Sequence, residues 1–114
     1  MKCGCNKDNS EKGMKLTLAG LTEYGENTIV SRVIVENSSG TLTVFAFDEG
    51  QGLSEHSAPF DAIVQVIDGE ADIKINGQSH FLRAGDLIIM PANIPHAVKA
   101  VTKFKMLLTM LKAV

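Results

Sequence analysis

The sequence predicts a single all-β domain, a sandwich or barrel of many short strands. Apolar residues recur with a period of two or in short runs, and no segment shows a convincing helical repeat. Turn signals rich in glycine, proline and asparagine separate these segments at roughly 8–12 residue spacing, which is typical of sandwiches and barrels. With 114 residues, 45% of them hydrophobic, the chain has enough apolar material for one core and too little length for two.

The predicted strands follow from β-branched and aromatic runs between these turn signals. The turn signals include a loop at 48–54, the hairpin pairs Asp68-Gly69 and Asn76-Gly77, and a tight loop at 91–95. We expect strands at residues 29–35, 41–47, 62–67, 71–75, 78–82, 87–90, 97–101 and 104–111.

The N-terminal residues 1–13 are polar and without periodicity, so we expect a flexible tail before a barrel domain at 14–114. Cys3 and Cys5 lie in this tail, one residue apart. They lack the further Cys or His expected of a zinc site, which favours a pair of exposed thiols over a soft-metal site.

The charge distribution argues against several partners. The formal net charge is −2 and the basic residues are scattered, whereas nucleic-acid-binding domains usually carry a basic patch. No apolar run approaches the roughly 20 residues of a membrane span, and the N-terminal residues lack a signal-peptide core. We therefore expect a cytoplasmic protein that binds neither nucleic acid nor membranes.

Some of the predicted strands are apolar on both faces. Only Gln65 interrupts the apolar run at 62–67, and residues 104–111 carry apolar side chains at both parities. Such a strand needs cover on both faces, and one small barrel covers only one of them. The pattern predicts a homodimer with sheet-to-sheet contact, and the alternative is that the tail or another strand covers the outer face.

Two segments carry the most specific spacing in the chain. The first is Gly50-x5-His56-x12-Gly69 and the second is Gly85-x5-Pro91-x-Asn93-x2-His96. Together they resemble the paired signature of the cupins, a resemblance that implies a double-stranded β-helix, or jelly-roll barrel. Asn93 stands where the family usually has glycine, and asparagine tolerates the left-handed backbone region well enough to keep the turn.

In metal-binding cupins, two histidines and an acid of the first segment join the histidine of the second around Mn, Fe, Ni or Zn. The resemblance implies that His56 and His96 are the first and last of these ligands, while Ala58 and Ala62 occupy the other two positions. Neighbouring acids such as Asp61, Glu55 and Glu49 remain alternative ligands, although strand parity directs Asp61 away from the pocket if the strand has already begun there.

The resemblance and strand parity together predict a snug, mostly apolar pocket for an organic ligand of modest size. Its predicted lining consists of His56, His96, Phe47, Ala58, Ala62, Met90 and Met106. Three functions remain open: a small-molecule sensor or carrier, a metal-dependent enzyme of the isomerase, decarboxylase or oxygenase class that uses His56 and His96, and an interaction protein that acts through its dimer surface. The alanines at two ligand positions favour the first.

Overall fold

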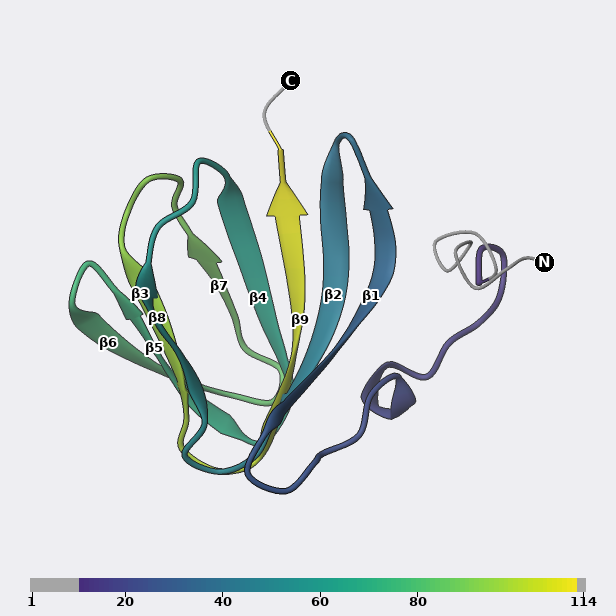
Figure 1. The fold of residues 1–114 in the computed structure, drawn as a ribbon, viewed down its shortest axis with the longest axis horizontal. Coiled ribbons are helices and arrows are strands. Elements are labelled where there is room, and N and C mark those ends of the chain that lie inside the picture. Colours follow the sequence, from purple (N-terminus) through teal and green to yellow (C-terminus); the bar gives the residue numbers. More distant parts are fainter. Residues whose placement is uncertain (1–10, 113–114) are drawn as a thin grey trace.

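A computed structural model describes residues 11–112, which form an antiparallel barrel of two sheets. A five-stranded sheet has the order β1-β2-β9-β4-β7, and a four-stranded sheet has the order β3-β8-β5-β6. The two sheets meet at one end of the molecule and diverge toward the other, like the sides of a V (Figure 1). The structure therefore confirms the predicted all-β barrel.

All but one of the secondary-structure elements in the described residues are strands. The exception is the 3₁₀ turn η2 (Leu18–Gly20). The strands are β1 (Ile29–Asn37), β2 (Gly40–Phe47), β3 (Gly52–His56), β4 (Asp61–Asp68), β5 (Glu70–Ile75), β6 (Gln78–Arg83), β7 (Leu87–Met90), β8 (His96–Ala100) and β9 (Phe104–Leu111).

Strand β3 corrects the loop predicted at residues 48–54. Gly52 pairs with Lys99 of β8, and a Cβ atom on Gly52 would overlap the carbonyl oxygen of Val98. The glycine is therefore required by the close approach of the neighbouring strand, a known reason for glycine inside a strand. Because that contact is between residues far apart in the sequence, the local pattern indicated a loop.

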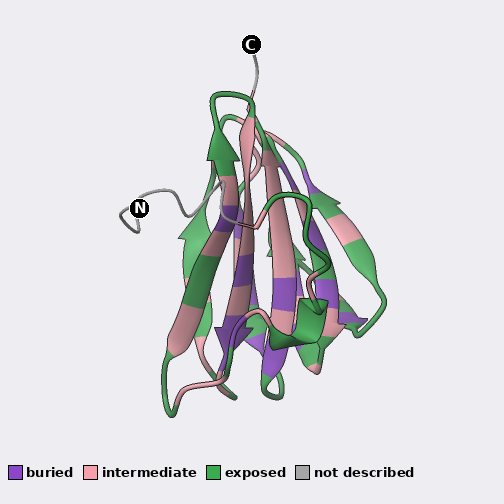
Figure 2. Cartoon of the chain, turned by 90° about the vertical axis from the view of Figure 1, so that its right-hand side faces the viewer, coloured by how far each residue is buried: buried purple, intermediate pink, exposed green. Residues whose placement is uncertain are grey.

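The core fills the space between the sheets and is densest where they meet. Phe47, Phe104, Ile73 and Val64 are fully buried, and the rings of Phe47 and Phe104 stack with centroids 4.6 Å apart. Most of the buried bands in Figure 2 lie in the lower part of the strands. We call this the closed end of the barrel, and we call the end where the sheets diverge the open end.

The turns adopt the backbone conformations that the sequence predicts. Asn76 and Gly77 have φ angles of 52° and 83°, as a two-residue hairpin with left-handed central residues requires. Asn93 has a φ of 65°, so the asparagine does take the left-handed conformation expected of the glycine it replaces.

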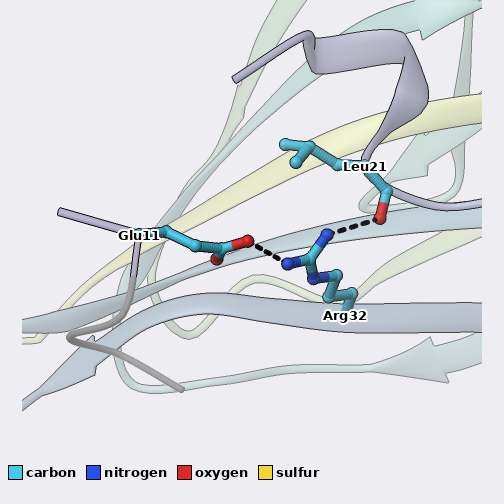
Figure 3. Close-up of polar contacts among 3 residues, drawn as sticks. All are labelled: Glu11, Leu21 and Arg32. Carbon is cyan, nitrogen blue, oxygen red and sulfur yellow. Dashed lines mark hydrogen bonds and ion pairs between the residues drawn. The ribbon is translucent and has the colours of Figure 1, made fainter. Parts of the chain in front are cut away.

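The N-terminal segment crosses the outer face of the five-stranded sheet near the closed end (Figure 2). Arg32 of β1 pairs with Glu11 and donates a hydrogen bond of 3.2 Å to the carbonyl of Leu21 (Figure 3). Lys105 Nζ of β9 donates to the carbonyl of Ala19 at 2.6 Å, and the hydroxyl of Tyr24 donates to Asp68 at 2.6 Å. These contacts fasten the segment across β1, β9 and β4.

Two apolar side chains on this outer face of β2 are buried. Val44 and Ala46 pair with Leu107 and Lys105 and have the opposite parity to the interior residues of β2, yet both are fully buried. The predicted tail includes Glu11, which makes the ion pair described above, whereas Cys3 and Cys5 lie outside the described residues. Among residues 11–112, no helix is long and apolar enough to span a membrane.

Candidate functional site

The two histidines of the predicted site lie side by side at the open end. His56 ends β3, His96 begins β8, and the two residues are direct partners in the register of these strands. Their ring centroids are 4.5 Å apart and the rings meet edge to face at 72°. Two imidazoles forty positions apart in the sequence thus form one structural unit.

Two hydrogen bonds hold together the loops that carry these histidines. The backbone amide of Ala92 donates to Asp61 Oδ1 at 2.9 Å, and the backbone amide of Asn93 donates to the carbonyl of Ala58 at 2.7 Å. Loop 57–60 after His56 and the first residue of β4 are thereby joined to loop 91–95 before His96. The bond from the Ala92 amide also shows the role of Asp61. Its carboxylate fixes loop 91–95 and is not directed between the imidazoles.

The hydrogen bonds of the rings indicate their tautomers. His56 Nδ1 lies 2.8 Å from the carbonyl oxygen of Ser54, and His96 Nδ1 lies 3.2 Å from that of Ile94. A carbonyl oxygen only accepts, so each Nδ1 is assigned the proton. In its neutral form each ring then presents an Nε2 lone pair, which can accept a hydrogen bond from a ligand.

The two imidazoles differ in their exposure and therefore in their electrostatics. His96 is only 4% exposed, whereas His56 is exposed to solvent. Burial lowers the pKa of His96 below its usual value, the nearby His56 lowers it further, and the bond to Ile94 only partly opposes them. His96 is therefore a neutral acceptor at neutral pH.

The imidazoles border a small cavity between the two sheets. Its volume is about 50 Å³, and most of its walls are apolar. Residues from β3, β4, β7, β8, β9 and loop 57–60 line it: Leu53, His56, Ala58, Ala62, Met90, His96, Val98, Met106, Leu108 and Met110. Six of the seven predicted pocket residues are among these.

Phe47 is the predicted pocket residue that does not line the cavity. It ends β2 at the closed end, where its ring stacks on Phe104. Parity correctly directs Phe47 inward, but parity carries no information on how far along the barrel a side chain lies. Conversely, strand parity could have identified Val98 and Met110, because they share the parity of the other cavity residues on β8 and β9. Leu53 could not be identified in this way, because residues 48–54 were predicted to form a loop and not a strand.

The interior cavity is small compared with ordinary ligand pockets. Its volume corresponds to roughly one or two waters at about 30 Å³ each, whereas drug-sized pockets measure about 300–1,000 Å³. A larger hollow of about 560 Å³ lies on the outer face of the four-stranded sheet, beside Asp72, Lys74 and Lys99. That hollow is open to solvent and contains neither histidine, so the interior cavity is the better candidate site.

The residues present do not fit the four-ligand metal centre of metal-binding cupins. Residues 11–112 contain no group of three or more His, Cys, Asp or Glu side chains placed to share an ion. Ala58 and Ala62 line the cavity at the two positions where further ligands would stand, and neither can coordinate. His80 gives no help, because its Nδ1 lies 3.3 Å from the carbonyl of Ile73 and it does not line the cavity.

Comparison with known proteins gives a consistent answer. A family profile described as Cupin domain matches residues 43–111, which include both histidines. None of the curated proteins compared with this chain matches it.

Several solved structures resemble the whole barrel. A conserved protein of unknown function from Streptococcus pyogenes has a TM-score of 0.87 and 37% identity, with 93% of each chain covered. A cupin superfamily protein from Desulfitobacterium hafniense DCB-2 has a TM-score of 0.84 and 29% identity over 90% of this chain and 94% of that one. A Cupin 2 conserved barrel domain protein from Leptotrichia buccalis has a TM-score of 0.82 and 40% identity over 85% of this chain, which spans about half of that protein.

Proposed function

The chain belongs to the cupin family, and we propose that it is a small-molecule-binding barrel, a sensor or carrier, whose ligand enters between His56 and His96. The observation that carries the proposal is the pairing of two imidazoles beside an apolar cavity in which alanines, Ala58 and Ala62, occupy the other two metal-ligand positions. Such a site combines two hydrogen-bonding side chains with an apolar lining, which is the usual composition of a small-molecule site.

The geometry favours an organic ligand that carries a hydroxyl group. With each Nδ1 engaged by a carbonyl, the Nε2 atom of a neutral ring is an acceptor, so it pairs best with a donor such as a hydroxyl. The thioether and aliphatic side chains of Met90, Met106 and Leu108 would contact the apolar part of the ligand. The cavity holds only a few non-hydrogen atoms, so the rest of the ligand would extend past the exposed His56 into solvent.

A metal-dependent enzyme is the weaker alternative. Two imidazoles alone leave most coordination positions to water and hold a divalent ion weakly. The carboxylate of Asp61, next to the usual acid position at Ala62, is bonded to the amide of Ala92. No observation in the described residues supplies the third ligand that an isomerase, decarboxylase or oxygenase of this family would need.

Thermal unfolding in the presence of small polyols, sugars and hydroxy acids tests the proposal. A ligand at 100 times its Kd stabilises the folded state by about 2.7 kcal/mol, which shifts the Tm of a domain of this size by several degrees. We expect such a shift with the wild type, no shift with Ala62→Leu, which fills the cavity, and an unchanged shift with Lys74→Ala, which alters only the outer hollow.

Elemental analysis of protein purified without a metal-affinity tag separates the two functions. The proposed binding barrel contains far less than one transition metal per chain. About one Mn, Fe, Ni or Zn per chain, lost in His96→Ala, would contradict the proposal and establish the metal-dependent alternative.

A further inference from the structure

The outer hollow lies on the four-stranded sheet (β3, β8, β5 and β6 in Figure 1) and has charged walls. Its volume of about 560 Å³ is within the range of about 300–1,000 Å³ that is usual for small-molecule pockets. The interior cavity, by contrast, is small and mostly apolar. The residues of the outer hollow that matter here are Gly52, Ser54, Asp72, Lys74, Ala97 and Lys99.

The strand register explains why this part of the sheet is hollow. On the outer face of β8, Lys99 pairs with Gly52 of β3 on one side and with Asp72 of β5 on the other. Two residues earlier on the same face, Ala97 pairs with Lys74 of β5. Gly52 and Ala97 leave open space beside the lysines because they have little or no side chain. Diagonal neighbours on paired strands are about 7–8 Å apart at Cα, so Lys74 and Lys99 can both reach a ligand above Ala97.

The charged groups of the outer hollow have few partners in their own chain. Within residues 11–112, Lys74 and Lys99 form no ion pair with a carboxylate. Asp72 Oδ2 accepts a hydrogen bond of 3.0 Å from Ser79 Oγ, whereas Asp72 Oδ1 is buried and has no donor among the described residues. A buried carboxylate oxygen without a donor is unfavourable, which favours a ligand that brings one. Lysine side chains are long and flexible, so Lys74 and Lys99 can turn toward a ligand and admit it to Asp72.

We propose that the outer hollow binds an acidic α-amino acid, a ligand with two carboxylates and one ammonium group. These charges complement, one for one, the two ammonium groups and the one carboxylate of the hollow. The carboxylates of the ligand pair with Lys74 and Lys99 above Ala97, and its ammonium group donates to Asp72 Oδ1. The proposal goes beyond the small-molecule site at the imidazoles. Since Lys99 and His96 are on opposite faces of β8, either site can fail without the other.

The expected affinity is modest because the lysines are exposed to solvent. Each ion pair with Lys74 or Lys99 contributes little there and is screened by salt. The contact between the ammonium group and Asp72 is the stronger one, since it is a charge-assisted hydrogen bond to a buried oxygen. We therefore expect a Kd of about 1 mM at low ionic strength, rising with added salt.

NMR titration of the isotope-labelled full chain with sodium L-glutamate, at constant ionic strength, tests the proposal. The backbone amide signals of Gly52, Asp72 and Lys99 should shift and saturate with a Kd of about 1 mM. The amides of Ala62 and Met106, beside the interior cavity, should keep their positions. Glutarate, which lacks the ammonium group, and L-glutamine, which lacks the side-chain charge, should each bind at least about 3-fold more weakly. No saturating shift at the hollow, saturating shifts at the interior cavity instead, or equal affinity for glutarate would each overturn the proposal.

Substitutions of the charged residues sharpen the test. Lys99→Gln should weaken L-glutamate binding at least about 3-fold. Lys12→Gln is the matched control, because it removes the same charge from the exposed N-terminal segment, and it should leave the affinity unchanged. Asp72→Asn removes the charge that attracts the ammonium group, so L-glutamate should lose its advantage over glutarate. An advantage that survives Asp72→Asn, or equal effects of Lys99→Gln and Lys12→Gln, would contradict the proposed site.

Discussion

The closed and open ends of the barrel are built from the same strands but packed in opposite ways. At the closed end, where the sheets converge (Figure 1), the fully buried rings of Phe47 and Phe104 stack on each other. At the open end, the same two sheets diverge, and between them lie alanines, methionines and two imidazoles around a cavity. The closed end therefore supplies the aromatic core, and the open end carries the cavity and its two imidazoles.

The difference predicts that stability is concentrated at the closed end. Replacing the fully buried Phe104 by alanine should lower the free energy of unfolding by about 3–5 kcal/mol, because the stacked ring of Phe47 loses its partner and a cavity remains. Urea denaturation measures this. Phe81→Ala, at an exposed position, should change the free energy by less than about 0.5 kcal/mol, and equal losses in the two variants would contradict the comparison.

The turns of the two ends should also respond differently to the same substitution. Gly69 lies at the closed end with a φ of 76°, and a Cβ atom there would overlap the carbonyl of Lys103. Gly69→Ala should therefore cost about 3 kcal/mol from backbone strain and overlap combined. Gly77, at the open end, has a φ of 83° but no atom within 4 Å of its Cβ position, so Gly77→Ala should cost only about 1 kcal/mol. A similar loss of unfolding free energy in both variants would show that the turn at the closed end is not more tightly packed than the turn at the open end.

At the open end, the loop hydrogen bonds should affect binding more than stability. Asp61→Ala removes the acceptor for the amide of Ala92, an exposed bond with a net contribution of about 0.5–1.5 kcal/mol. We expect a small loss of stability together with a several-fold weaker affinity for any ligand found in the thermal screen, because the two imidazoles lose their fixed separation. Asp61→Asn keeps an acceptor oxygen and should retain most of the affinity. A loss of stability without a change in affinity would exclude this positioning role.

The smallest expected effect is a pH dependence that originates at the open end. Burial and the neighbouring His56 lower the pKa of His96, so the folded state binds its proton less readily than the unfolded state. His96 therefore leaves stability unchanged well above pH 6.5 and reduces it as the pH falls below that value. Urea denaturation at pH 7.5 and 5.5 should show a smaller decrease for His96→Gln than for the wild type. An equal decrease in both proteins would assign the effect to other groups.

Much of this architecture could be predicted from the sequence because the relevant signals are local. The pair Asn76-Gly77 specifies its hairpin directly, and the spacing around His56 and His96 resembles a family signature that the fold confirms. The features that escaped prediction depend on distant contacts. Gly52 is in a strand because the backbone of β8 approaches it, and Phe47 misses the cavity because of its depth along the barrel. The volume of the cavity likewise follows from how far the sheets diverge, which no single segment encodes.

The two hydrogen bonds that the amides of loop 91–95 donate to residues 57–61 have a kinetic consequence. The Ala92 amide bonds to the side chain of Asp61, the first residue of β4, and the Asn93 amide bonds to the carbonyl of Ala58, so both hydrogen bonds break when residues 57–61 separate from loop 91–95. The rates at which these two amides exchange with deuterated solvent therefore report how often the rim of the barrel opens. Any molecule that bridges the imidazoles would slow exchange at these two positions together. The amides of the closed end, around Phe47 and Phe104, would keep their exchange rates.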